Sequence, residues 1–361
     1  MRRVRALSLA LVASGCTAPP EAGLTFEREN LTVVNRTGGQ LCVGTVELVD
    51  RELSRVSRVQ GLPTPPAMPV TLELGSDAVD DRCNIMPVSG VIAGCVVVGN
   101  GEVGIATELH TASHELVHAS RKAAGITGNP FFEEGLAETL RGGELAGYGI
   151  ADDAANDPLS PVDLSTGFES SVAAYITAGH FVSWLRDDLG DDVLFPALTS
   201  AAYVDNAAQI DTWFEAALGA SLEETTQRWR TESARSYWQL GPCEAARSLG
   251  SGTVVEGELD CSQEDTLGVL GGGSDNGGRM FSQRLCLDLG AAAQVEVALQ
   301  ADPTVSVSLT RLDGDGQPLE SGRVAGGETS TLDGSGSWLL FSVESSGDGP
   351  LPYRVELRPL P

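Results

Sequence analysis

The sequence predicts an α+β protein in two parts, a mostly helical first part and an all-β, sandwich-like second part. Its 361 residues exceed what one small domain needs. Apolar residues recur at helical spacing over much of residues 45–238. After about residue 241, apolar and polar residues alternate between turns rich in Gly, Asp and Ser, which is typical of a β-sandwich. The predicted boundary therefore assigns residues 24–242 to the first part and residues 243–361 to the second.

The composition allows a folded core and restricts the kinds of partner. Hydrophobic residues make up 42% of the chain and charged residues 20%, which argues against global disorder. Lys and Arg number 23 against 50 Asp and Glu, so the formal net charge is −27. Such an acidic surface repels phosphates, which excludes a nucleic-acid partner. It also argues against docking on anionic lipid through a basic patch.

The start of the chain predicts export. Residues 1–15 combine a basic beginning with a short apolar run, as a secretory signal peptide does. The segment ending in Cys16 resembles a bacterial lipobox, in which the cysteine is lipidated, and residues 16–23 would then form a tether. Cleavage after Ala18 is the alternative. We expect an exported bacterial protein that is secreted or held at the cell envelope, and that reaches the membrane only through a lipid anchor.

The cysteine count agrees with export. Setting Cys16 aside leaves six of the seven cysteines, and an even number in an exported protein indicates disulfides. Cys83 with Cys95 is the favoured local pair. The other pairings stay open, and some cysteines could remain buried free thiols.

The patterns predict individual elements in order along the chain. Strands are expected at residues 31–35, 70–74 and 91–98, and helices at 45–59, 107–124, 130–140, 171–189, 193–203, 206–218 and 221–238. Residues 142–169 have no periodicity, and a loop of that length is usually functional or mobile. In the second part we expect strands at residues 295–299, 305–312, 337–343 and 353–357. Ser221 and Glu224 resemble a helix capping box.

The chemistry is concentrated in the sequence from His114 to His118, an HExxH motif on a predicted apolar helix. Residues four apart lie on one helix face, so both imidazoles can reach one metal ion. Glu115 is next to them and can reach a water molecule on that ion. His110 lies eight residues before His118, about 12 Å along the helix axis, which is too far to share the ion.

A catalytic zinc site needs a third protein ligand. The metzincin extension requires Gly at position 121 and His at position 124, and this chain has Arg121 and Ala124. Instead, the sequence from Glu134 to Glu138 is EGLAE, and its first four residues match the EGxA that ends the zinc signature of the aminopeptidase N family. The chain resembles the gluzincin, peptidase-MA-like metallopeptidases over about residues 107–190. Glu133 is the neighbouring rival, but it points about 100° away on a helix.

The resemblance implies roles for particular residues. It implies a zinc ion (Zn²⁺) held by His114, His118 and Glu134, with Glu115 as general base. It also implies that Glu138 hydrogen-bonds the far nitrogen of a ligand histidine, although a solvated helix carboxylate is an equal alternative. Gluzincins often stabilise the oxyanion with a Tyr or His beyond the third ligand. Tyr175 is the first candidate here and His180 the second. Core packing or a surface position is an equal alternative for each.

The sequence therefore predicts a zinc-dependent peptidase acting on a peptide or protein substrate. It lacks a GxMEN run before His114, which favours an endopeptidase over an aminopeptidase. One alternative is a zinc-binding surface lipoprotein without proteolytic activity. Another is a binding protein whose β domain captures a ligand; the second part resembles, in pattern alone, the pre-peptidase C-terminal domains of secreted bacterial proteases. Nothing in the sequence indicates the oligomeric state.

Overall fold

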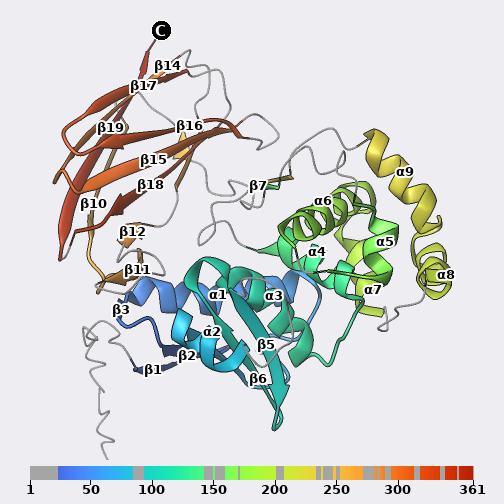
Figure 1. Cartoon of the computed structure of the whole chain (residues 1–361). Helices are drawn as coiled ribbons and strands as arrows, with labels where there is room; N and C mark the ends of the chain where they lie inside the picture. Colours follow the sequence, from blue (N-terminus) through green and yellow to red (C-terminus); the bar gives the residue numbers. More distant parts are fainter. Residues whose placement is uncertain are drawn as a thin grey trace, which may run out of the picture.

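The protein has the α+β architecture that the sequence predicts (Figure 1). The computed structural model describes residues 23–83, 93–141, 149–150, 159–169, 171–200, 207–232, 237–238, 247–248, 253–270, 280–282, 285–288, 294–312, 318–333, 338–347 and 349–360. The predicted signal peptide, Cys16 and almost all of the predicted tether lie outside these residues. Within the described part, no helix is both long enough and apolar enough to cross a membrane.

A five-stranded mixed sheet forms the base of the first part. Its strand order is β1-β2-β4-β6-β5, in which β2, β4 and β6 run parallel and the two outer strands run antiparallel to their neighbours. The strands are β1 (Thr25–Glu27), β2 (Thr32–Asn35), β4 (Val70–Leu74), β5 (Gly94–Gly99) and β6 (Glu102–Thr107). The strands predicted at 31–35, 70–74 and 91–98 are confirmed within the described residues. Strand β6 was not predicted.

Helices pack against this sheet, and further helices pack against those. Helix α1 (Val43–Val59) buries Val46, Val49 and Leu53 on the face that its helical spacing predicts. The helix predicted at 107–124 begins as the short 3-10 turn η1 (Leu109–Thr111) and continues as α3 (Ala112–Ala123). Helix α4 (Pro130–Leu140) has the predicted bounds, and α6 (Val172–Leu189) packs along it. Helix α2 (Ser76–Cys83), which was not predicted, leads to the first cysteine of a disulfide.

The remaining helices correct two expectations. Helix α5 (Pro161–Thr166) lies inside the stretch predicted to be loop, most of which falls outside the described residues. Helices α7 (Asp191–Ser200), α8 (Ala207–Leu218) and α9 (Leu222–Glu232) follow. Helix α9 ends before the predicted residue 238, because β8 (Tyr237–Trp238) is extended and pairs with β7 (Gly149–Ile150). The predicted capping box is present: the Glu224 N–H donates to Ser221 Oγ at 3.1 Å, and the Ser221 N–H donates to Glu224 Oε2 at 3.3 Å.

The second part consists of two β-sheets that share one core. The first sheet contains β10 (Thr253–Leu259), β19 (Leu351–Leu360), β14 (Gln294–Ala301) and β17 (Thr329–Asp333), in that order. The second has the path β16 (Pro318–Ala325), β15 (Val305–Leu312), β18 (Trp338–Ser345), β12 (Met280–Ser282), β11 (Thr266–Leu270) and β3 (Gln40–Leu41), with β13 (Leu285–Asp288) and β9 (Arg247–Ser248) attached beside it. Val297 and Val355 from the first sheet and Val307 and Val343 from the second are fully buried in a common cluster. The four strands predicted in this part are confirmed.

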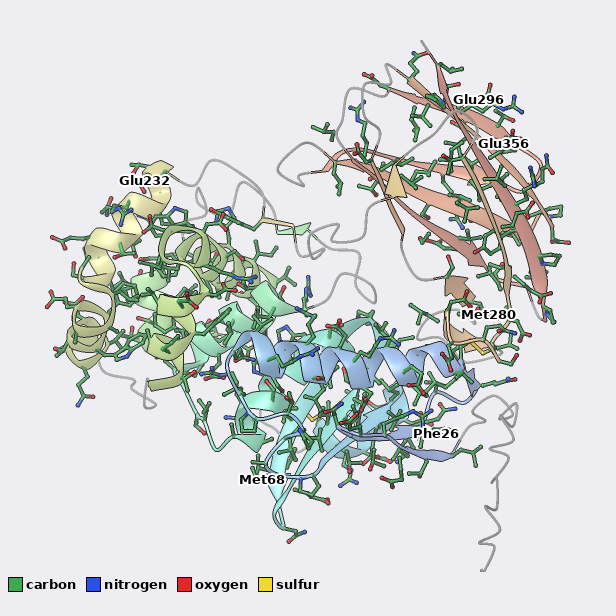
Figure 2. All side chains as sticks on the ribbon, turned by 180° about the vertical axis from the view of Figure 1, so that it is seen from behind. Phe26, Met68, Glu232, Met280, Glu296 and Glu356 are labelled. Atoms are coloured by element: carbon green, nitrogen blue, oxygen red, sulfur yellow. A yellow bond between two sulfur atoms is a disulfide. The ribbon has the colours of Figure 1, made fainter. Side chains whose placement is uncertain are left out.

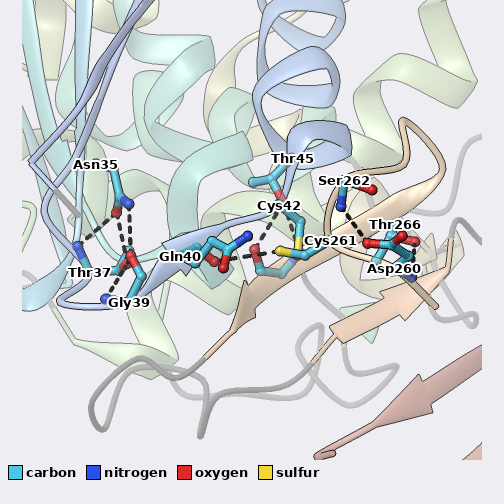
Figure 3. The surroundings of a disulfide bond; sticks show 11 residues. Asn35, Thr37, Gly39, Gln40, Cys42, Thr45, Asp260, Cys261, Ser262 and Thr266 are labelled. Carbon is cyan, nitrogen blue, oxygen red and sulfur yellow. Dashed lines mark hydrogen bonds between the residues drawn. A yellow bond between two sulfur atoms is a disulfide. The ribbon is translucent and has the colours of Figure 1, made fainter. Parts of the chain in front are cut away.

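The two parts are joined around the start of α1 (Figure 3). Strand β3 precedes α1 in the chain but pairs with β11 of the second part. A disulfide links Cys42 to Cys261, and the Gly268 N–H donates a hydrogen bond of 2.8 Å to the Thr45 hydroxyl oxygen. Met280, fully buried, lies at the end of the sandwich next to α1 (Figure 2). A short N-terminal segment therefore belongs to the sandwich, across the boundary that the sequence predicts at residue 243.

A second disulfide joins Cys83 at the end of α2 to Cys95 in β5, which confirms the favoured local pair. Both sulfurs lie in a small buried cluster with Ala78 and Ala106. Cys243 and the side chain of Cys286 lie outside the described part.

Candidate metal centre

Helix α3 presents both histidines of the HExxH motif on one face. Leu116 and Val117, between them in sequence, are fully buried and hold the helix against the sheet. Because residues four apart share a face, His114 and His118 project from the helix together. Their Nε2 atoms lie 3.1 Å apart.

Helix α4 brings Glu134 to the same point. Its Oε2 atom lies 3.1 Å from His114 Nε2 and 3.2 Å from His118 Nε2. The helix begins at Pro130 with Asn129 as its N-cap, and the Asn129 side chain accepts a hydrogen bond from the Phe131 N–H at 3.0 Å. The local sequence therefore fixes the start of α4 one turn before the acidic residue.

Gly135, which follows Glu134, lies where α4 and α6 cross closely. A Cβ atom at this position would lie 2.5 Å from the Ala178 carbonyl oxygen and 2.6 Å from a methyl of Val182, both in α6. The close crossing of α4 and α6 therefore depends on the missing side chain. Thr139 adds a hydrogen bond of 3.0 Å to Ser183 across the same contact. The glycine of the EGLA segment thus sets the position of α4, and with it the position of Glu134.

The three ligand atoms have the spacing that a zinc ion needs. Atoms bound tetrahedrally at about 2.1 Å stand roughly 3.4 Å apart, close to the 3.1–3.2 Å separations found here. Lone pairs of a carboxylate and two imidazoles at this spacing need a positive charge between them. Within the described residues, this is the one group of three or more His, Cys, Asp or Glu side chains close enough to hold a metal ion. The residues fit zinc.

Glu138 orients the first histidine. Its Oε1 atom lies 2.9 Å from His114 Nδ1, as the resemblance implies, and its Oε2 atom lies 3.1 Å from an Arg141 guanidinium nitrogen. All three side chains are largely buried. A carboxylate at Nδ1 favours the proton on that nitrogen, which leaves the lone pair of Nε2 for a metal ion.

Glu133 points away from the cluster of His114, His118 and Glu134. Both of its carboxylate oxygens accept hydrogen bonds from Arg121, at 2.7–3.0 Å, and both side chains are buried. Arg121 also donates to the Leu198 carbonyl at 3.0 Å. Glu133, the alternative third ligand, thus forms a buried ion pair. Its partner, Arg121, is one of the two residues that break the metzincin pattern.

The buried charges shift one another's pKa values. Burial lowers the pKa of His114, but hydrogen bonds with Glu134 and Glu138 outweigh it and raise the pKa to about 10. Burial likewise opposes the charged form of His118, and the charge of Glu134 raises its pKa overall. Burial raises the pKa of Glu134, yet the two histidines bring it below its usual range. The site without metal therefore attracts positive charge.

Glu115 lies between α3 and the edge of the sheet. The residue is 8% exposed, and this burial raises the pKa of its carboxyl group, although the charges of His114 and His118 act in the opposite direction. The carboxylate lies against Gly94, the first residue of β5. A carboxylate whose pKa lies above its usual range is better suited to accept and return a proton near neutral pH.

Of the two oxyanion candidates, the structure brings Tyr175 to the cluster. The Tyr175 ring centroid lies 6.0 Å from that of His114 and 5.6 Å from that of Phe168, and the side chain is partly exposed. Position 175 lies in the first turn of α6, next to the crossing with α4. The Tyr175 ring therefore lies next to the imidazole of His114.

The surroundings of His180 favour the core-packing alternative over a role at the oxyanion. Its imidazole is fully buried, and its Nδ1 atom accepts a hydrogen bond of 2.9 Å from the Trp229 indole N–H. The Tyr237 ring packs edge-on against it at 4.8 Å. The indole of α9 and the phenol ring of β8 thus hold His180 in the core, which argues against contact with a substrate. His110, partly exposed, lies 3.2 Å from a Glu108 oxygen and is not part of the metal cluster.

Sequence reasoning missed two residues at this site. Arg141 follows Glu138 by three positions, a helical spacing at which opposite charges meet, so this signal was available. Gly94 had no such local signal, because its contact with Glu115 depends on how the strand packs on the helix.

Comparisons with known proteins add little to this geometry. No protein-family model matches the chain, and no curated protein matches it. Among solved structures, the chain is similar to a family GH115 4-O-methyl-α-glucuronidase, BtGH115A, with specificity for decorated arabinogalactans. The likeness has 11% identity and a TM-score of 0.20, covering 55% of this chain and 31% of the glucuronidase, so the chain spans about a third of that structure. At this TM-score the likeness carries no argument about fold or activity.

Proposed function

We propose that this protein is a zinc-dependent peptidase of the gluzincin type. The observation that carries the proposal is the triangle of His114 Nε2, His118 Nε2 and Glu134 Oε2, with sides of 3.1–3.2 Å. Three protein ligands leave one position of a tetrahedral zinc ion open for water or substrate, which is the arrangement of a catalytic site and not of a structural one.

The residues around the triangle supply what peptide hydrolysis requires. A zinc ion held there would polarise the scissile carbonyl and make the attacking water more acidic. Glu115 accepts the proton of that water and passes it to the leaving amine. Tyr175 donates a hydrogen bond to the oxyanion that develops on the substrate carbonyl. Glu138 and Arg141 keep His114 in its binding orientation.

The edge of the sheet favours an extended peptide as substrate. Strand β5 is the outer strand of its sheet in the described residues, and Val97 and Val98 on it are 41% and 49% exposed. An extended peptide can add to such an edge through main-chain hydrogen bonds. Because Gly94, at the start of this strand, lies against Glu115, a peptide bound along it would pass the general base. We favour an endopeptidase because the sequence lacks the GxMEN run.

The direct test is a digest of casein and a peptide library with the purified protein, with and without a chelator, beside the Glu115→Gln variant. Glu115→Gln removes the base and keeps the ligands, so we expect zinc to stay bound and turnover to fall by about 10²–10⁴-fold. Glu47→Gln serves as the control. It also replaces a carboxylate with an amide, but in a partly exposed ion pair with Arg28 that is far from Glu115 in the sequence. Full turnover by Glu115→Gln would reject the mechanism. A wild-type protein that binds zinc and cleaves nothing would favour the non-proteolytic alternative.

We also infer that the protein acts outside the cytoplasm. The two disulfides agree with an oxidising compartment. If Cys16 carries a lipid, Cys16→Ala moves the protein from the membrane fraction to the soluble fraction of its native host. A wild-type protein already in the soluble fraction would contradict the lipid anchor.

A further inference from the structure

We propose that Gly94 is a positioning residue for Glu115: the missing side chain at the start of β5 leaves the space that the Glu115 carboxylate occupies. The inference rests on the proposed function, in which Glu115 is the general base. It concerns a residue that lies outside both metal-binding helices.

The geometry is tight on two sides. A Cβ atom built at position 94 would lie 2.6 Å from Glu115 Oε1 and 2.8 Å from Glu115 Cγ. It would also lie 2.7 Å from Thr107 Oγ1, and Gly94 and Thr107 are directly paired across β5 and β6. All three separations are shorter than non-bonded atoms tolerate, so an added methyl group forces something to move.

The strand itself is held on both sides of Gly94. The Ala93 carbonyl accepts hydrogen bonds from the Glu108 N–H at 3.0 Å and from the Thr111 hydroxyl at 3.0 Å. On the other side, Cys95 is tied to Cys83 by the disulfide, inside a buried cluster. The beginning of β5 therefore resists moving away from α3.

Thr107 is equally restrained. Its side chain is fully buried, and its hydroxyl lies 2.8 Å from the Thr111 hydroxyl, 3.1 Å from the Glu108 carbonyl oxygen and 3.3 Å from that of Ala93. The partner with the most freedom to give way is the Glu115 side chain. A methyl group at position 94 would therefore displace the carboxylate. None of the three nearest atoms that it would meet belongs to His114 or His118, so we expect both imidazoles to keep their places.

The test compares Gly94→Ala with the matched control Gly104→Ala. Gly104 lies in β6 of the same strand pair, and a Cβ atom there would meet its nearest neighbour, the Val97 carbonyl oxygen, at an ordinary 3.8 Å. With a peptide that the wild type cleaves, we expect Gly94→Ala to lower kcat by about 10²-fold, the effect of misplacing a catalytic group by roughly 1 Å. The zinc content and KM should stay at wild-type values. Gly104→Ala should keep the wild-type kcat.

A second readout does not depend on turnover. Thermal unfolding of the metal-free full chain is measured for Gly94→Ala in the wild-type background and in a Glu115→Ala background. The clash should lower Tm by about 3 °C or more with Glu115 present, and by much less once its side chain is gone. If Gly94→Ala alone does not fold, recovery of folding in the double variant supports the contact, and failure of both overturns it.

The outcomes separate the two claims. Wild-type kcat in Gly94→Ala, or an equal loss of Tm in both backgrounds, overturns the positioning role. No cleavage by the wild type overturns the proposed function instead, and the pair of Tm measurements still decides whether Gly94 keeps Glu115 in place.

Discussion

Two buried histidines, His114 in α3 and His180 in α6, have opposite surroundings. Both ring nitrogens of His114 face groups that attract a cation, Glu138 at Nδ1 and the cluster of Glu134 and His118 at Nε2. His180 receives an indole N–H at Nδ1 and is packed by aromatic rings. Burial is similar in the two cases, so the chemistry of the neighbouring atoms separates a candidate metal ligand from a core residue.

The largest expected difference concerns zinc content. His118→Ala removes one of three ligands, so we expect the bound zinc to fall from about one ion per chain to nearly none. His180→Leu removes an imidazole that does not face the cluster and should keep the full zinc content. Elemental analysis of the purified proteins measures both. Zinc retained in His118→Ala would contradict the assignment of His118 as a ligand. Zinc lost in His180→Leu would contradict the assignment of His180 to the core.

A smaller effect is expected from the carboxylate behind His114. Glu138→Gln keeps the shape but weakens the hydrogen bond that fixes the imidazole, so we expect zinc affinity to fall by about 10–100-fold. Competition with a chromogenic chelator measures the affinity. Glu133→Gln offers no control here because its ion pair is buried; Glu47→Gln does. An unchanged affinity would mean that Glu138 does not orient His114.

The core histidine should matter for stability instead. In His180→Leu, Trp229 loses the acceptor of its indole N–H, and we expect the free energy of unfolding to fall by about 1–3 kcal/mol. Urea unfolding of the metal-free protein measures this change. A stability equal to the wild type would show that the hydrogen bond of 2.9 Å contributes nothing net.

The smallest expected effect is the pH dependence of the stability of the metal-free protein. Because the folded-state pKa of His114 is about 10, against 6.5 unfolded, its stabilising contribution is complete below pH 6.5 and is lost as pH rises toward 10. We therefore expect the Tm difference between wild type and His114→Gln to shrink from pH 7 to pH 9. A difference that grows over this range would contradict the raised pKa.

The sequence predicted the helices that carry the site because their signals are local. Asn129 and Pro130 mark the start of α4, and apolar spacing marks α3. Strand β6 was missed although its turn had a signal: Asn100 and Gly101, both with positive φ, form the two-residue connection between β5 and β6.

Other features depend on packing that no local pattern reports. Strand β3 has two residues, and its partner β11 lies more than 200 residues later in the chain. The cluster of His114, His118 and Glu134 was predictable because spacing on two helices determines which side chains can meet. The burial of His180 against Trp229 and Tyr237 was not predictable, because the sequence of α6 does not indicate which residues pack against that side of the helix. The same holds for Gly94, whose role comes from the contact between a strand and a helix.

The central claim is that two imidazoles and one carboxylate hold a single zinc ion. X-ray absorption at the zinc edge of the zinc-loaded full chain tests it most directly. We predict two nitrogen ligands at about 2.0–2.1 Å and oxygen ligands at about 2.0–2.2 Å, with no sulfur. A sulfur shell at about 2.3 Å, or a spectrum unchanged in His118→Ala, would contradict the assignment.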